Sequence, residues 1–259
     1  MNHFSMGLWL LGLTFAVALL GSVIGLACTR YGMATTRPAV RMRWFSMGAL
    51  SIGGVGIWLM HFIAMLGFAV PGSPFRYSLT WMLISALISV TGVLAGLYML
   101  GTEFSWPRIL AAGFIIGTTI SVVHYTGMRA LHLQGQINYD TLLVALSLVI
   151  AIAGGTAVLW ITMVMRSTSL RLIATPIMGV TVVGMHYTGM AAVEIINDPS
   201  APAPTGFALF PFIFPVFVFG LLTLAVPIVA VLTVRDRELA RMDAASDDLA
   251  QEARQLADH

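Results

Sequence analysis

The stretch HYTGM occupies residues 124–128 and recurs letter for letter at residues 186–190. A related stretch, HFIAM, occupies residues 61–65. The histidines of these stretches follow one another at intervals of 63 and 62 residues, which is the length of two membrane-spanning helices with their connections. The spacing therefore predicts three repeated helix pairs, each with its histidine on the second helix.

The composition is that of a membrane protein. Hydrophobic residues make up 58% of the chain and charged residues only 9%, and the mean hydropathy is +0.91, which is too apolar for a soluble domain. A bilayer core about 30 Å thick needs roughly 20 apolar helical residues, and continuous apolar runs favour helices over barrel strands. We predict an all-α polytopic membrane bundle of seven transmembrane helices, built from three helix-pair repeats plus a seventh helix. The expected spans are residues 7–28, 44–70, 79–100, 109–131, 141–165, 172–196 and 207–234.

Arginine sets the expected orientation, because the chain contains no lysine. The connections on one side of the membrane hold only Arg76 and Arg129. By the positive-inside rule, the amino terminus lies outside and the carboxyl terminus in the cytoplasm. The connections assigned to the cytoplasm hold seven arginines: Arg30, Arg37, Arg41, Arg43, Arg108, Arg166 and Arg171.

The tail, residues 235–259, differs in character from the membrane domain, residues 1–234. Its apolar positions alternate at spacings of three and four, which indicates about three heptads of a coiled coil. A solvated amphipathic helix is the alternative. A parallel coil would make the protein a homodimer and would lead to a cytoplasmic effector domain that this chain lacks. The expected a and d positions are Leu239, Met242, Ser246, Leu249, Ala253 and Leu256.

The histidines His61, His124 and His186 are expected at one level of the membrane. Counted from the predicted helix ends, they lie roughly 10–15 Å below the outer surface, at 1.5 Å per residue. Ionisable groups inside a membrane are costly and tend to be functional. We therefore predict a binding site at this level. Haem binding, a proton relay and structural hydrogen bonding are the alternatives to a metal ion.

Three methionines make copper the best match to this site. Met65, Met128 and Met190 each follow a histidine by four residues, so each shares a helix face with it. Imidazole binds copper, zinc, iron and nickel, whereas a thioether selects soft ions such as Cu(I). Zinc is less suited, although three histidines and a water would hold it. Met60 and Met185, which directly precede two of the histidines, are possible additional ligands.

Further polar residues follow the motifs. His132 comes four residues after Met128 and Glu194 four after Met190, so each would extend its ligand face by one helical turn and is a possible ligand. Together with Arg129 they would form an entry mouth for a ligand or an ion. An ion pair between Arg129 and Glu194 at the interface is the alternative. Four hydroxyl side chains are expected to orient the histidine rings or to anchor the helix ends: Tyr125, Tyr187, Thr126 and Thr188.

The stretches MHF, VHYTGM and MHYTGM resemble the MHYT sensor domain of bacteria. The resemblance covers residues from about 7 to 234, with departures at Val123, which replaces the methionine, and at Phe62 and Ile63, which lack the hydroxyls. It implies a multi-pass protein of the bacterial inner membrane, at the amino terminus of signalling proteins that often carry GGDEF and EAL domains for cyclic-di-GMP synthesis and hydrolysis. The resemblance further implies that the domain senses oxygen, carbon monoxide or nitric oxide through bound copper.

We therefore expect a membrane sensor of a diatomic gas or of copper. A haem-binding oxidoreductase and a copper transporter are the alternatives, of which the transporter would need ligands at several depths. Catalysis is not expected in this chain, because it has no Gly-rich phosphate loop and no paired intramembrane carboxylates. Nucleic-acid binding is not expected either, since the net charge is only +2 and the arginines are explained by topology.

Overall fold

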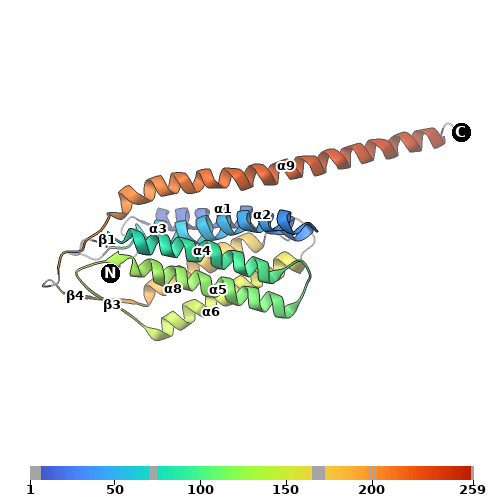
Figure 1. The fold of residues 1–259 in the computed structure, drawn as a ribbon. Coiled ribbons are helices and arrows are strands. Elements are labelled where there is room, and N and C mark those ends of the chain that lie inside the picture. Colours follow the sequence, from blue (N-terminus) through green and yellow to red (C-terminus); the bar gives the residue numbers. More distant parts are fainter. Residues whose placement is uncertain (1–6, 70–74, 165–172, 199, 201, 258–259) are drawn as a thin grey trace.

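The chain folds into a bundle of long, roughly parallel and antiparallel helices with short strands at one end (Figure 1). The computed structural model describes residues 7–69, 75–164, 173–198, 200 and 202–257. Two of the arginines used for the orientation, Arg166 and Arg171, lie outside the described residues. The end of the bundle that carries the strands is called the strand end below.

Within the described residues, seven helices cross the bundle, as the sequence predicts. Six of them are long and apolar enough to cross a membrane. The exception is α8, whose His186, Tyr187 and threonines lower its hydropathy. The second helix is composite, running through α2, a π-helical segment η1 and α3. The helices are α1 (Trp9–Ala34), α2 (Pro38–Ala49), η1 (Leu50–Leu59), α3 (Met60–Met65), α4 (Leu79–Leu100), α5 (Trp106–Arg129), α6 (Thr141–Val164), α8 (Ala174–Ala191) and α9 (Leu209–Ala257).

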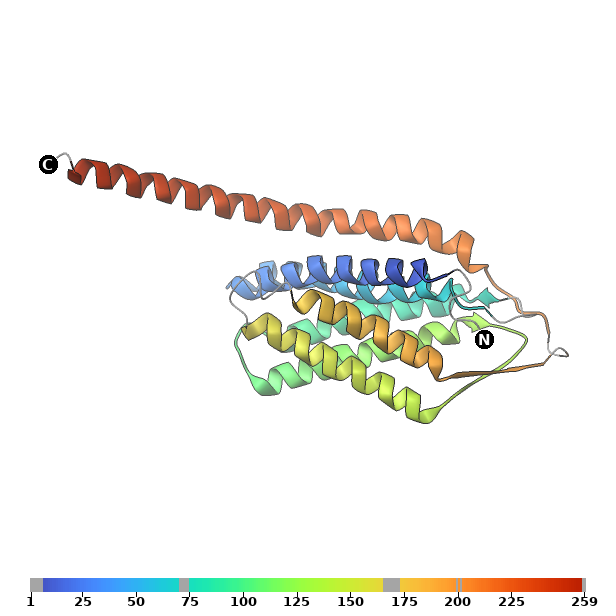
Figure 2. The same ribbon diagram turned by 180° about the vertical axis from the view of Figure 1, so that it is seen from behind.

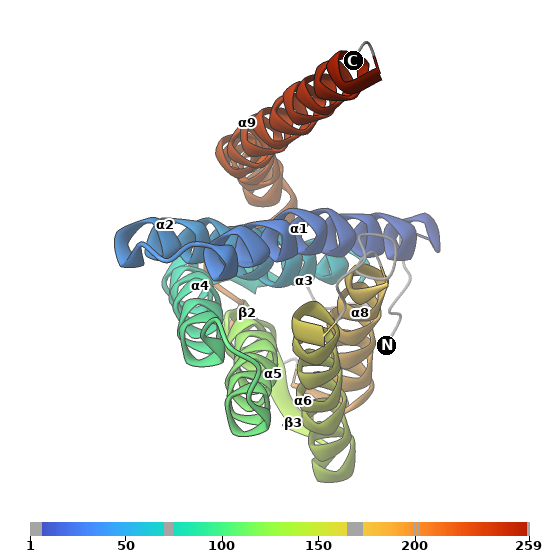
Figure 3. The same ribbon diagram turned by 90° about the vertical axis from the view of Figure 1, so that its right-hand side faces the viewer.

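Six of the helices form a closed ring. Each packs against its neighbours in the order α1, η1, α4, α5, α6 and α8, and α8 packs back against α1. The histidine-bearing helices α3, α5 and α8, together with η1, also make contacts across the middle of the ring. Figure 3 looks along the bundle and shows α9 outside this ring, on the side of α1. The repeat therefore brings its second helices together at the centre.

The strand end differs from the predicted helix ends. Strand β1 (Arg76–Tyr77) pairs with β2 (Leu131–His132), and β3 (Gly135–Tyr139) pairs with β4 (Val193–Asn197). The backbone after α5 and α8 is taken up by these strands: Ala130 O accepts from Ser78 N, and Ala192 O from Asp140 N, both at 2.8 Å. The expected extra helical turn at His132 and Glu194 is therefore wrong.

Because the helices end early, each histidine lies only four or five residues before the end of its helix. At 1.5 Å per residue this is about 6–8 Å, less than the expected depth. Gly135 begins β3 with φ of 139°, a backbone conformation that L side chains rarely adopt. A glycine at this point lets the chain turn back over the ends of the helices.

The π-helix η1 was not predicted. It spans Leu50–Leu59, is buried along almost all of its length, and ends two residues before His61. The Ser89 hydroxyl on α4 donates a hydrogen bond of 2.7 Å to Gly53 O within it, which satisfies a carbonyl in the widened turns. Such π segments occur often next to functional sites.

The last helix, α9, runs without interruption from the strand end far beyond the opposite end of the bundle (Figures 1 and 2). It includes Pro215 and Pro227, and only 11% of its apolar window is buried within the chain. The tail is therefore helical, as the coiled-coil prediction requires. The pairing with a second copy stays a prediction, because the side chains at the predicted a and d positions are not among those described.

Candidate metal centre

The three histidines of the repeat meet at the centre of the ring. His61 on α3, His124 on α5 and His186 on α8 are each only 2% exposed. Nδ1 of His61 lies 3.1 Å from Nδ1 of His186 and 3.4 Å from Nδ1 of His124. The ring centroids are 5.0–5.1 Å apart and the rings are nearly perpendicular to one another. The expectation that the histidines share one level is confirmed.

Hydrogen bonding does not fully account for this convergence. A neutral imidazole nitrogen carries either a proton or a lone pair, so it is a donor or an acceptor but not both. Nδ1 of His61 faces two other Nδ1 atoms and has one proton or one lone pair to offer them. It can therefore form one good hydrogen bond with one neighbour or share a weaker one between both. A cation at the centre accepts the lone pairs of all three nitrogens at once.

The separations also fit a metal ion. Ligand nitrogens bind transition metals at about 2.0–2.1 Å, so two nitrogens on one tetrahedral or trigonal ion lie roughly 3.3–3.6 Å apart. The Nδ1 separations of 3.1 Å between His61 and His186 and 3.4 Å between His61 and His124 come close to this range. Among the described residues these histidines form a cluster with all ligand atoms within 4.8 Å. The donor set suits copper and zinc alike.

Two glycines of the motif hold the imidazoles in place. A Cβ on Gly127 would collide with Nε2 of His61, and a Cβ on Gly189 would collide with Nε2 of His124. His61 and His124 thus each pack on the glycine that lies three residues after the histidine of the next repeat. Within the described residues, neither Nε2 has a hydrogen-bond partner. An unpaired buried polar group lowers the stability of the fold by about 1–3 kcal/mol, and such groups are found at functional sites.

The aromatic residue after each histidine packs against its ring. The centroid distances are 4.9 Å for Phe62 on His61, 4.8 Å for Tyr125 on His124 and 5.0 Å for Tyr187 on His186, all with perpendicular rings. The first repeat keeps this contact although Phe62 has no hydroxyl. An aromatic ring, rather than a hydroxyl, is therefore the element common to the three repeats at this position.

The tyrosine hydroxyls point away from the histidines, toward the outer helices. Tyr125 donates to the Ser147 hydroxyl on α6 at 2.8 Å, because Ser147 gives its own proton to Val144 O. In the first repeat, Trp58 Nε1 donates to Ser85 on α4 at 3.0 Å and replaces the missing tyrosine contact. These bonds fix the histidine-bearing helices to the ring.

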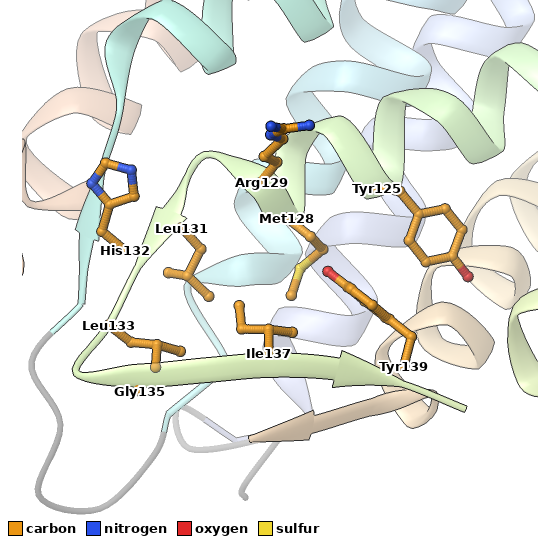
Figure 4. A pocket seen from close by; sticks show the side chains of 9 residues that line it. All are labelled: Tyr125, Met128, Arg129, Leu131, His132, Leu133, Gly135, Ile137 and Tyr139. Atoms are coloured by element: carbon orange, nitrogen blue, oxygen red, sulfur yellow. The ribbon is translucent and has the colours of Figure 1, made fainter. Parts of the chain in front are cut away.

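The methionines of the motif are buried beside the histidines. Met65, Met128 and Met190 are 2%, 0% and 2% exposed, and Met60 and Met185 are each 1% exposed. The Met128 sulfur faces a pocket at the strand end (Figure 4). Their role as ligands stays a prediction.

Other residues of the predicted site lie apart from the histidine cluster. His132 is exposed on β2 and binds Thr205 O through Nδ1 at 3.0 Å. Glu194 is exposed on β4. Arg129 does not pair with Glu194; its guanidinium carbon lies over the Trp81 ring, 4.5 Å from the ring centroid. The threonines lie half-buried beside the histidines: Thr188 gives its hydroxyl proton to Gly184 O of its own helix, and Thr126 lies at the matching place on α5.

Comparison with known proteins agrees with the repeat. The family described as a bacterial signalling protein N-terminal repeat, MHYT, matches residues 54–113, 117–175 and 179–242, which is more than half of the chain. No solved structure matches the chain significantly.

Curated relatives include two proteins of Pseudomonas aeruginosa. The bifunctional diguanylate cyclase/cyclic di-GMP phosphodiesterase MucR is 38% identical over 71% of this chain, and the cyclic di-GMP phosphodiesterase NbdA is 34% identical over 76%. The signaling protein YkoW of Bacillus subtilis is 29% identical over 77%. The matched region covers 25–27% of these relatives, so this chain spans about a quarter of their length. The chain belongs to the MHYT family, the membrane sensor region of bacterial signalling proteins.

Proposed function

We propose that this chain binds one copper ion at the centre formed by His61, His124 and His186. The signal that the chain senses is either a diatomic gas that binds this ion (oxygen, carbon monoxide or nitric oxide) or the copper ion itself. The observation that carries the proposal is the convergence of three Nδ1 atoms, two pairs of which lie 3.1 and 3.4 Å apart. Met65, Met128 and Met190 are the proposed thioether ligands. They favour Cu(I) over zinc, because soft sulfur prefers soft ions.

The alternatives fit the centre less well. Two axial histidines on one haem iron lie on opposite faces of the macrocycle, about 4 Å apart when each nitrogen is about 2 Å from the iron. The separations of 3.1 and 3.4 Å are shorter, and the third imidazole would occupy the space of the macrocycle. A transporter would need ligands at several depths, whereas these histidines lie at one level.

The proposed signal passes through α9. The segment that leads into α9 is bound to the strand end at two places. Tyr77 and Phe207 exchange backbone hydrogen bonds of 2.8 and 3.0 Å, and His132 Nδ1 forms a hydrogen bond with Thr205 O. Leu131 and His132 follow α5, which carries His124. A change of ligation at His124 would thus shift β2 and the start of α9. A sensor of this kind needs a ligand that binds its two packings differently.

The wider setting follows from the family and from the sequence. We infer that the chain lies in the bacterial inner membrane with its amino terminus periplasmic and its carboxyl terminus cytoplasmic. The heptad pattern of the tail supports pairing with the tail of a second copy. The tail leads to a cyclic-di-GMP effector, because named relatives are a diguanylate cyclase/phosphodiesterase and a phosphodiesterase.

X-ray absorption at the copper edge tests the proposed ligands. Copper-loaded protein should show a nitrogen shell and a sulfur shell, and the M65L/M128L/M190L variant should keep the nitrogen shell and lose the sulfur. Carbon monoxide or nitric oxide should alter the spectrum of the wild-type protein. A nitrogen shell alone in the wild type would remove the methionines from the site, and an unchanged spectrum under every gas would leave copper itself as the signal.

A further inference from the structure

A pocket lies at the strand end, beside the last turns of the helix that carries His124. It encloses about 480 Å³ between the end of α5 and strand β3 (Figure 4). Three of its lining residues, Tyr125, Met128 and Arg129, belong to the last two turns of α5, and Ile137 and Tyr139 come from β3. The pocket therefore opens at the surface and reaches down to the motif helix that carries His124.

Met128 links this pocket to the centre. Its side chain is 0% exposed, yet it lines the pocket, and Figure 4 shows its sulfur facing Ile137 and Tyr139. It lies one helical turn after His124, so their Cβ atoms are about 5–6 Å apart. Tyr125, which also lines the pocket, packs on the His124 ring at 4.8 Å. Met65 and Met190, at the matching places of the other repeats, do not line this pocket.

The chemistry of the pocket suits a soft monovalent cation. Its nine lining residues include no carboxylate, so it offers little to hard ions such as calcium or magnesium. The guanidinium of Arg129 is held over Trp81 and points away from the Met128 sulfur (Figure 4). Its repulsion of a divalent ion is twice that of a monovalent one.

We propose that this pocket is the entry port through which Cu(I) reaches the histidine centre from the strand end, with the Met128 thioether as the first buried ligand on the way to His124. The inference rests on the proposed copper site and adds a route and a direction to it. Tyr139 and Tyr125, whose ring centroids are 5.5 Å apart, form the wall beside the sulfur. Met190 has the same sequence context in the third repeat but does not line this pocket.

The rate of copper loading tests the port. Full-length purified chain in detergent is mixed with Cu(I) held by a coloured chelator, and the loss of chelator colour gives both the rate and the final copper content. Ile137→Trp places a bulky ring in the pocket, and Ile196→Trp on the partner strand β4 is the matched control, since Ile196 is 56% exposed and does not line it. We expect Ile137→Trp to slow loading about tenfold or more, which corresponds to about 1.4 kcal/mol of barrier, with the final copper content unchanged. Ile196→Trp should load like the wild type.

A second pair of variants keeps the test independent of pocket folding. Met128→Leu and Met190→Leu each remove one thioether with little change of volume. The port predicts slower loading for Met128→Leu than for Met190→Leu, whatever the two changes do to affinity. Equal rates in this pair, or an unaffected rate in Ile137→Trp, would overturn the port while leaving the copper site standing. A wild-type chain that takes up no Cu(I) would overturn both.

Discussion

Nδ1 of His61 and Nδ1 of His186 lie 3.1 Å apart although 125 residues separate them in the chain. The contact depends on a ring of helices in which the first and third repeats are neighbours through α1 and α8. Apolar helices alone would pack in many ways. The convergence of the Nδ1 atoms of three imidazoles is what makes this ring a candidate site rather than a packing arrangement.

Glycine at the fourth position of the motif should be required for metal binding. Gly127→Ala and Gly189→Ala place a methyl group against the imidazoles of His61 and His124. We expect each to destabilise the chain by about 1–3 kcal/mol through overpacking and to weaken copper binding, as measured by competition with a Cu(I) chelator. Gly184→Ala, on the same helix as Gly189, is the control, because its Cβ would meet nothing within 4 Å. Equal copper affinity in all three variants would contradict the role given to these glycines.

The tyrosine hydroxyl should contribute to stability but not to the metal site. Tyr125→Phe removes the hydrogen bond to Ser147, which is worth about 0.5–1.5 kcal/mol, and keeps the ring that packs on His124. We expect a lower melting temperature with an unchanged copper content, because Phe62 in the first repeat packs on His61 without a hydroxyl. A double-mutant cycle with Ser147→Ala isolates the bond. Loss of copper in Tyr125→Phe would instead make the hydroxyl part of the site.

The orientation can be read by thiol labelling in intact cells. Cys28 is the single cysteine and is 0% exposed, so it should not react. A cysteine in place of Asn138 on β3 should react with a membrane-impermeant maleimide, and one in place of Ala244 on α9 should react only after the cells are opened. Both positions are exposed. The reverse pattern would place the strand end in the cytoplasm and contradict the positive-inside assignment.

The dimer can be tested at the tail. In a Cys28→Ala background, Leu249→Cys lies at a predicted d position and should form an intermolecular disulfide on mild oxidation, since facing d residues approach closely in a parallel coil. Gln251→Cys, two residues on and outside the seam, should cross-link far less. Equal cross-linking at both positions would indicate random encounters, and the tail would then be a solvated single helix.

Much of the fold could be predicted from the sequence because its signals are local and strong. Apolar runs and a period of 62–63 residues predict seven helices and three repeats, and the shared position of His61, His124 and His186 predicts their common level. The strands were missed because the runs stay apolar past Arg129 and Ala191, where the backbone pairs with other segments instead of continuing the helix. A pairing between distant segments has no local signal in one sequence.

The packing of the imidazoles on glycines was not predicted, for the same reason. Glycines in membrane helices commonly allow close helix packing, yet the group that approaches Gly127 and Gly189 is a histidine ring from another repeat. The widened turns of η1 before His61 likewise depend on the packing of α4 through Ser89. The residues of the motif could be identified from the sequence. Which of them contact one another depends on how the helices of the ring are arranged.

Metal content tests the central claim most directly. Purified wild-type chain exposed to Cu(I) and freed of excess metal should hold about one copper per three-histidine centre by elemental mass spectrometry, because the three imidazoles converge on one point and imidazole binds copper. The His61→Ala, His124→Ala, His186→Ala triple variant should hold none, while His132→Ala, a change on the exposed strand β2, should retain it. A wild-type chain that takes up no Cu(I), or a triple variant that binds as much as the wild type, would contradict the account.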